Sequence, residues 1–275
     1  MVDFELDFSF DHQTEIPVLV NKASDRPLVD FQVFGERSSG TNFLTELARR
    51  NTKLRPVQNY GWKHGWPVSV GYHPQSLILF IYREPIDWAV GMFNKPHAAH
   101  SSVELSSFSA FIRSEWAIFI RRNSNRVWGE RWNATARPNL DLLEHAMDRH
   151  PLTGRRFRNI FEMRSLKLIA GLSFRNRNCN FIAAPYEAIR DNRKLFLRHL
   201  QDHFGVQLSD DVDIVKERVS PPNPTENRFE RSQIIVDDFD FISSQLDHRL
   251  EKAVGYSLDP KTLSAVNKTT PDRFD

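Results

Sequence analysis

Residues 35 to 43 have the types and spacing of a loop that binds a phosphate or sulfate group. The segment reads Gly35, Glu36, Arg37, Ser38, Ser39, Gly40, Thr41, Asn42 and Phe43. Glycines let the backbone approach an anion closely, and the unpaired N–H groups at the start of a helix attract negative charge. The hydroxyl groups of Ser38, Ser39 and Thr41 add hydrogen-bond donors, and Arg37 adds positive charge.

The spacing from Gly35 to Gly40 is that of a P-loop, the phosphate-binding loop of many nucleotide-hydrolysing enzymes. Thr41 and Asn42 stand where the hydrolysing version carries a lysine and a serine or threonine. The segment is therefore predicted to hold an anion without that lysine. The alternative is an ordinary polar turn whose following helix is capped by a serine or threonine.

Three further segments carry side chains that suit anion chemistry. Lys63 and His64 lie between two tryptophans, Arg83 precedes a Glu-Pro pair, and Tyr186 follows a proline. Because an imidazole titrates near neutral pH, His64 suits a general base. Arg83 can bind a phosphate through two parallel hydrogen bonds. In the structural alternatives, His64 is a surface residue, Arg83 pairs with Glu187, and Tyr186 belongs to the core.

Each of these segments follows an apolar or extended stretch of the chain. Apolar runs predict strands at 29–34, 77–82 and 180–184, and amphipathic patterns predict helices at about 41–50, 85–93 and 187–203. The run at 77–82 is continuous, as in a strand buried on both faces of a parallel sheet. Strands that alternate with helices predict an α/β fold, a parallel sheet with helices on both faces.

Ligands of such sheets bind at the carboxyl ends of the strands. The polar segments at 35–42, 61–67, 83–91 and 185–187 are therefore expected to converge on one edge. Phe43 lies on the inward face of its helix, so it can contact a ligand or simply fill the core.

The remaining segments are predicted to frame this sheet. We interpret 1–28 as a peripheral segment with an edge strand within 16–20, 216–231 as a loop and 261–275 as a tail. Helices are also predicted at about 103–122, 161–172 and 237–254, and residues 54–60 are expected to be extended. Residues 29–260 would then form a single domain, in which 94–175 is a largely helical insertion.

Composition restricts the classes of partner. The chain has 275 residues and a formal net charge of +2, so no global field calls for nucleic acid. Its single cysteine, Cys179, excludes an internal disulfide and fits a reducing compartment. The N-terminus lacks the pattern of a signal peptide and no apolar run is long enough for a membrane span, so we expect a cytoplasmic protein.

Two other groups of side chains are weaker candidates. His97 and His100 lie near Lys95, but no third ligand accompanies them, so no metal is expected. A patch rich in tryptophan and arginine suits a sugar ring or an anionic glycan, although such patches are more often structural; it consists of Arg126, Trp128, Arg131 and Trp132.

In order and type, the four polar segments resemble those of the sulfotransferase superfamily that uses 3′-phosphoadenosine 5′-phosphosulfate. The loop from Arg37 to Phe43 is similar to the family's 5′-phosphosulfate loop, and Lys63-His64-Gly65-Trp66-Pro67 is similar to its Lys-x-His-x-Pro segment. Arg83-Glu84-Pro85 is similar to the Arg-x-Pro segment for the 3′-phosphate, and Tyr186-Glu187 to the pair beside the adenine. The similarity covers roughly 29–95 and 178–256.

The resemblance implies a P-loop-like fold whose insertion at 94–175 forms the acceptor side. It implies a 5′-phosphosulfate site at Arg37, Ser38, Ser39, Gly40, Thr41 and Asn42, a 3′-phosphate site at Arg83 and Gly91, and adenine contacts at Phe43 and Tyr186. Ser38 stands at the family's basic position, and Gly91 replaces its usual serine. Either Arg37 or Lys63 would supply the missing charge. Arg228 and Arg231 are the candidates for a further basic loop.

The implied reaction moves a sulfuryl group from the donor to a hydroxyl group, with no metal required. His64 would be the general base, while Lys63 and Arg37 would stabilise the charge that grows on the leaving phosphate. The acceptor is expected to be a carbohydrate or a small metabolite. A P-loop kinase-like phosphotransferase and a nucleotide-binding protein without catalysis are the alternatives.

Overall fold

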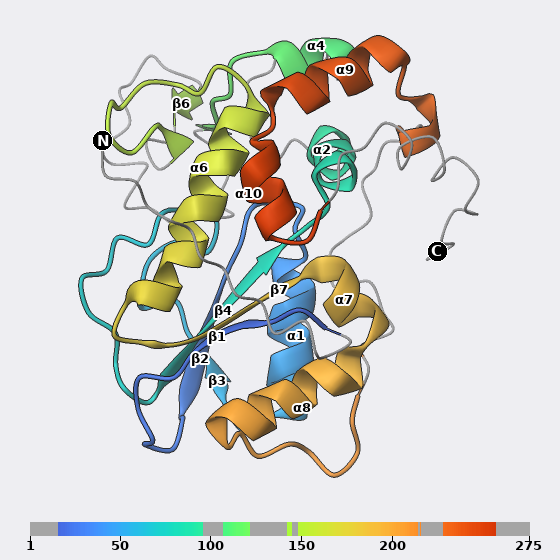
Figure 1. Cartoon of the computed structure of the whole chain (residues 1–275). Helices are drawn as coiled ribbons and strands as arrows, with labels where there is room; N and C mark the ends of the chain where they lie inside the picture. Colours follow the sequence, from blue (N-terminus) through green and yellow to red (C-terminus); the bar gives the residue numbers. More distant parts are fainter. Residues whose placement is uncertain are drawn as a thin grey trace.

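A five-stranded sheet organises the part of the chain that the computed structural model describes, which is residues 16–95, 107–121, 142–144, 148–213, 215 and 228–256. Figure 1 shows the sheet running through the middle of the molecule. The interpretations of 1–15, of His97 and His100, of the patch at 126–132 and of the tail fall outside the described residues.

The sheet is mostly parallel, as the sequence predicts. Its order is β1-β7-β4-β2-β3, with β1 Leu19–Asn21, β2 Asp30–Phe34, β3 Arg55–Pro56, β4 Ser76–Tyr82 and β7 Asn180–Pro185. Strands β2, β3, β4 and β7 run parallel, and β1 pairs antiparallel with the edge of β7. The expected edge strand near 16–20 is therefore confirmed. Of the extended stretch expected at 54–60, two residues pair as β3.

The central strand β4 shows why the apolar run at 77–82 is continuous. All of its residues are buried. Leu77, Leu79 and Ile81 face one hydrophobic cluster, while Ile78 and Phe80 face another. Because strand side chains alternate, a strand covered on both faces needs apolar residues at every position.

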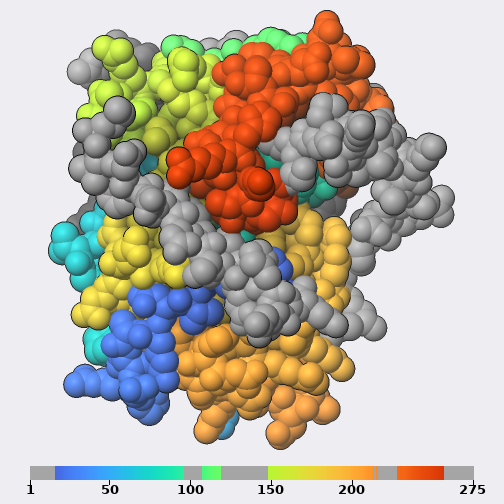
Figure 2. All heavy atoms as spheres, in the orientation of Figure 1, coloured from blue at the N-terminus to red at the C-terminus, as the bar shows by residue number. Residues whose placement is uncertain are grey.

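Helices cover both faces, as predicted. The α-helices are α1 Thr41–Asn51, α2 Pro85–Asn94, α4 Phe108–Arg113, α6 Ile160–Leu172, α7 Tyr186–Asp191, α8 Arg193–Phe204, α9 Val236–Gln245 and α10 His248–Ala253. Short 3₁₀ turns lie at η2 Ser173–Asn176 and η3 Arg231–Gln233. Helices α1, α7 and α8 pack on one face of the sheet, and α6 and α10 on the other (Figure 1). In Figure 2 the orange and red atoms of α9 and α10 adjoin those of α6.

The helix predicted at 103–122 is wrong beyond Arg113. Helix α4 ends there, and Ser114 is extended. The chain then enters β5 Phe119–Arg121, which pairs antiparallel with β6 Leu142–Glu144. Trp116 fixes the extended path, because its backbone N–H bonds to Phe157 O at 2.9 Å and its indole bonds to Asp148. Tertiary partners thus override a local helical pattern.

Two other predicted helices are each divided. The helix at 187–203 breaks at Asn192 into α7 and α8, and α8 ends at Gly205, which has the left-handed conformation expected of it. The helix at 237–254 breaks after Gln245, and the side chain of Asp247 caps α10 by accepting from Leu250 N. Amphipathic periodicity continues across both breaks, so the pattern alone does not reveal them.

Candidate functional site

The predicted polar segments meet at the carboxyl edge of the sheet. Among the parallel strands the order is β3-β2-β4-β7. The connection that leaves β2 leads to β3 on one side, and the connection that leaves β4 leads toward β7 on the other side, so the two run in opposite directions. In open α/β sheets this reversal places a crevice outside the ends of the two strands concerned, here β2 and β4. The loop after β2 and the turn after β4 therefore form the centre of the site.

The loop after β2 is tightly folded around its two glycines. A Cβ atom on Gly35 would lie 2.4 Å from Ile81 O, and one on Gly40 would lie 2.4 Å from Cδ2 of Tyr186. Gly40 also has a φ of 95°, which favours glycine. Ser39 is buried and its hydroxyl donates to Glu36 O at 2.6 Å. This hydrogen bond from the Ser39 hydroxyl stabilises the conformation of the loop.

Helix α1 begins at this loop with an open N-terminus. Gly40 is its N-cap residue, and no side chain caps the helix. The alternative of a serine- or threonine-capped turn is therefore wrong. Thr41 is buried in the first turn, while Asn42 is exposed and accepts a hydrogen bond from Nζ of Lys63. The first turn thus combines the positive end of the helix dipole with a lysine ammonium group.

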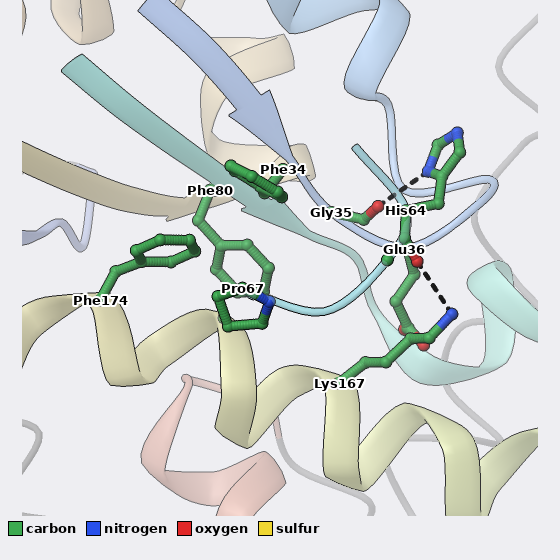
Figure 3. Close-up of a pocket in the computed structure, with 10 residues that line it drawn as sticks. Phe34, Gly35, Glu36, His64, Pro67, Phe80, Lys167 and Phe174 are labelled. Atoms are coloured by element: carbon green, nitrogen blue, oxygen red, sulfur yellow. Dashed lines mark hydrogen bonds between the residues drawn. The ribbon is translucent and has the colours of Figure 1, made fainter. Parts of the chain in front are cut away.

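His64 is attached to the same loop. Its Nδ1 lies 2.8 Å from Gly35 O, and Gly35 N donates to Lys63 O at 3.0 Å. Burial, reinforced by the nearby charges of Lys63 and Arg37, lowers the pKa of His64 well below its usual 6.5. In Figure 3 the second ring nitrogen points away from Gly35. The ring is therefore a neutral base at physiological pH.

Arg37 and Lys63 occupy different parts of the site. The guanidinium of Arg37 lies 5.2 Å from the centre of the Trp62 ring, and its backbone carbonyl accepts from Nε1 of Trp88 at 2.9 Å. Burial lowers the pKa of Arg37, although Asp148 opposes the effect. The ammonium group of Lys63 contacts the first turn of α1 through Asn42.

Arg83 joins the end of β4 to the loop. Its Nη1 donates to Ser38 O at 3.2 Å, and its guanidinium lies 5.1 Å from the centre of the Tyr186 ring. Its Nε forms an ion pair with Oε1 of Glu187 at 3.9 Å, so the pairing expected in the structural alternative is present, although Nε makes no hydrogen bond. A Cβ atom on Gly91 would lie 3.1 Å from Ser38 Cβ and 3.3 Å from Arg83 Nη1. Three predicted residues from two segments are thus in mutual contact.

The two aromatic candidates also meet. The rings of Phe43 and Tyr186 lie 5.7 Å apart in an edge-to-face arrangement. Tyr186 comes from the start of α7 and packs against Gly40, while Phe43 comes from the first turn of α1. Both side chains are only partly buried. Together they provide an aromatic boundary to the site.

Of the two arginines predicted for a basic loop, Arg231 reaches the site's margin. Its Nη1 donates to Glu84 at 2.9 Å and to Asp87 at 3.0 Å, at the start of α2. Burial raises the pKa of Glu84 to about 7, although Arg231 opposes the effect. Arg231 is therefore bonded to Glu84, the residue that follows Arg83 in the sequence.

Sequence reasoning missed a cluster of buried charges beneath the loop, formed by Glu36, Asp148, Arg164, Lys167 and Glu251. Arg164 donates to both oxygens of Glu251, and Lys167 donates to Asp148 and to His64 O. Charged residues on a helix are normally read as exposed. The available signal was spacing, because Arg164 falls three residues after the buried Phe161 and Lys167 falls four residues after the buried Met163.

The charges of this cluster balance when Glu36 is neutral. Burial opposes the ionisation of Asp148, but Lys167 and Arg37 outweigh it and lower the pKa of Asp148. Burial raises the pKa of Glu36 to about 7, against the attraction of Arg164 and Lys167. Two cations then face the two carboxylates Asp148 and Glu251, and the raised pKa of Glu36 makes it the acid of the cluster that is protonated most readily.

A small cavity lies between this cluster and the sheet (Figure 3). Its polar side carries Glu36, His64 and Lys167, and its apolar side carries Phe34 and Phe174 among others. The volume is about 10 Å³, which suits roughly one water molecule. The cavity is therefore too small for a nucleotide.

Searches of the described residues add two findings. They contain no group of three or more histidine, cysteine, aspartate or glutamate side chains placed to hold a metal ion. No helix in these parts of the chain is long and apolar enough to cross a membrane.

Comparisons of the chain with models of known protein families, with curated proteins and with solved structures gave no match.

Proposed function

We propose that this protein is a sulfotransferase that moves a sulfuryl group from 3′-phosphoadenosine 5′-phosphosulfate to an acceptor hydroxyl, with a carbohydrate or small metabolite as the acceptor class. The observation that carries the proposal is the contact of Arg83 with the loop at 35–42, here called the anion loop. Nη1 of Arg83 donates to Ser38 O in this loop at 3.2 Å. This contact brings a guanidinium group beside the uncapped start of α1. A ligand with two separate phosphate groups would engage both.

The residues present fit such a donor. In this proposal the loop N–H groups and the first turn of α1 receive the 5′-phosphosulfate, in a P-loop-like manner. Arg83 receives the 3′-phosphate through its guanidinium group, which lies beside Ser38 in the loop. Phe43 and Tyr186 bound the adenine, for which aromatic faces and edges are suitable partners.

The proposed step is a direct transfer in which charge and protons balance. An oxygen–sulfur bond forms to the acceptor as the bond from sulfur to the phosphate oxygen breaks. His64 Nε2 takes the proton that the acceptor hydroxyl loses. Lys63 stabilises the charge left on the phosphate oxygen. Its contact with Asn42 favours Lys63 over Arg37, whose guanidinium stacks on Trp62, for this role.

The first experiment measures binding. A ligand of the native state raises its melting temperature, so adenosine 3′,5′-bisphosphate should stabilise the protein more than ATP, ADP or adenosine 5′-monophosphate at equal concentration. Arg83→Ala should remove most of that preference. Arg55→Ala is the control, because Arg55 is exposed on β3 at the opposite end of the strands. Absence of any stabilisation at millimolar concentration would overturn the proposal.

The second experiment measures transfer. Incubation with donor carrying labelled sulfate and a panel of sugars, phenols and alcohols should yield a labelled product, and Arg83→Ala should reduce its formation. Binding of adenosine 3′,5′-bisphosphate without transfer to any acceptor would instead favour a nucleotide-binding protein without catalysis.

A further inference from the structure

Arg164 is a buried cation with an extensive set of partners. It lies on α6 with 1% of its surface exposed. Its Nε donates to Oε1 of Glu251 at 2.6 Å and its Nη2 to Oε2 at 2.8 Å, a bidentate pair that joins α6 to α10. Parallel hydrogen bonds of this kind fix the plane of the guanidinium as well as its position.

The same guanidinium reaches both halves of the proposed donor site. Its Nη2 donates to Arg83 O at 2.9 Å, and its Nη1 is 3.6 Å from Oε2 of Glu36. It also lies 5.2 Å from the centre of the Trp88 ring, whose indole N–H supports Arg37 O. A side chain from one helix is therefore in contact with the turn after β4 and with the loop after β2.

We infer that Arg164 is a positioning residue for recognition of the 3′-phosphate; this inference rests on the proposed function. By holding the carbonyl of Arg83, it fixes where the backbone turns away from β4 and so directs the Arg83 side chain toward Ser38. Arg164 itself is buried beneath the site and does not contact the ligand.

The effect should be selective because the loop after β2 has supports of its own. Gly35 is bonded to Lys63 and His64, and Ser39 is bonded to Glu36 O. Loss of the bond from Arg164 to Arg83 O should therefore disturb the 3′-phosphate contact more than the 5′-phosphate contact. A purely structural ion pair would weaken both equally or neither.

Arg113 offers a control with similar partners elsewhere in the molecule, although its side chain is 34% exposed. It also donates to a buried carboxylate, that of Asp238, and to a backbone carbonyl, Asp237 O at 3.1 Å. Its guanidinium likewise lies over an aromatic ring, 4.4 Å from the centre of Phe241. These contacts join α4 to α9 and involve neither Arg83 nor the loop.

The test compares dissociation constants for adenosine 3′,5′-bisphosphate and adenosine 5′-monophosphate. In Arg164→Lys the ammonium group can still pair with Glu251 but cannot also reach Arg83 O in the same geometry. The dissociation constant of the monophosphate divided by that of the bisphosphate should fall about tenfold, the loss expected for one charge-assisted hydrogen bond, with little change in the constant of the monophosphate. Arg113→Lys should leave the ratio unchanged.

A second variant protects the test against misfolding. Arg164→Met combined with Glu251→Leu removes both buried charges together, which proteins often tolerate. It should show the same fall in the ratio. An unchanged ratio, or equal weakening of both ligands, in a folded variant would overturn the role of Arg164. Failure of the wild-type protein to bind either nucleotide would instead overturn the proposed function, and with it this inference.

Discussion

Nδ1 of His64 lies 2.8 Å from the carbonyl oxygen of Gly35, and this bond determines the chemistry open to the imidazole. A carbonyl oxygen can only accept, so Nδ1 carries the proton and Nε2 of the neutral ring has a free lone pair. The bond also attaches the proposed base to the first residue of the anion loop. A single hydrogen bond thereby joins the proposed base to the proposed anion site.

The first prediction separates the base function of His64 from its support of the loop. His64→Asn keeps a side-chain N–H that can reach Gly35 O but offers no base, so donor binding should persist while the transfer rate falls by roughly 10²–10⁴-fold. His64→Ala should also weaken donor binding. His73→Asn, exposed at the opposite end of β4, should change neither. Equal transfer rates for His64→Asn and the wild type would exclude His64 as the base.

The pH profile supplies a further test of His64. Transfer requires the neutral ring, so the rate falls as pH drops through the pKa of the folded protein. Because that pKa is well below 6.5, kcat/KM should not decline between pH 7 and pH 6.5 and should fall only in more acidic solution. An acid limb centred at or above pH 6.5 would contradict the buried environment of His64.

The second prediction distinguishes Lys63 from Arg37. Lys63→Met should reduce kcat by about 10²–10³-fold, as for loss of one group that stabilises a developing anion. Arg37→Met should have the smaller effect on kcat, because its guanidinium stacks on Trp62. Burial lowers the pKa of Lys63, so its loss of charge should also set an alkaline limb that Lys63→Arg removes. The reverse ranking of the two methionine variants would assign the role to Arg37.

The third prediction concerns Gly40, which combines a positive φ with the Tyr186 ring 2.4 Å from an added Cβ atom. Gly154 also has a positive φ, of 68°, but nothing lies near its Cβ position. Gly154→Ala should therefore cost about 1–2 kcal/mol of unfolding free energy. Gly40→Ala should cost at least about 1 kcal/mol more, from overpacking, and should weaken nucleotide binding. Urea denaturation of both variants would show equal losses if the Tyr186 contact were unimportant.

The elements of the fold that could be predicted are those whose own residues carry the signal, and the elements that were missed depend on distant parts of the chain. The run at 77–82 revealed the central strand because burial on both faces requires an apolar residue at each of these positions, and this leaves a continuous pattern in the sequence. Gly35 and Gly40 likewise marked a tight loop. The break at Asn192 and the strand at Phe119–Arg121 were missed, because they depend on what packs against the chain rather than on its own periodicity.

The residues of the candidate site also fall into those that could be predicted from the sequence and those that could not. Loop residues, His64 and Arg83 could be proposed from type and spacing, since the edge of a parallel sheet brings such segments together. The buried pairs could not, because spacing can place Arg164 on the inward face of its helix but does not identify Glu251, 87 residues away, as its partner. Charge pairing across the fold leaves no periodic trace in the sequence.

The last prediction uses Glu36, whose burial raises its pKa from 4.5 to about 7. Between these values the folded protein binds more protons than the unfolded chain, so stability falls as pH rises and levels off above about 7. The difference corresponds to roughly 3 kcal/mol for this buried group. Ionised Glu36 would give the buried cluster a net negative charge beneath the loop, and for this reason the stability falls as the pH rises.

Glu36→Gln keeps the size of the side chain and removes its titration. The variant should therefore match the wild type at about pH 5 and become more stable than it by up to roughly 3 kcal/mol near pH 8, as measured by urea denaturation across the range. Donor binding by the wild type should also weaken above pH 7, because an ionised Glu36 repels a bound anion, and Glu36→Gln should remove that dependence. A constant difference in stability between the two proteins from pH 5 to pH 8 would show that Glu36 does not retain its proton, and the charge balance of the cluster would then need another acid.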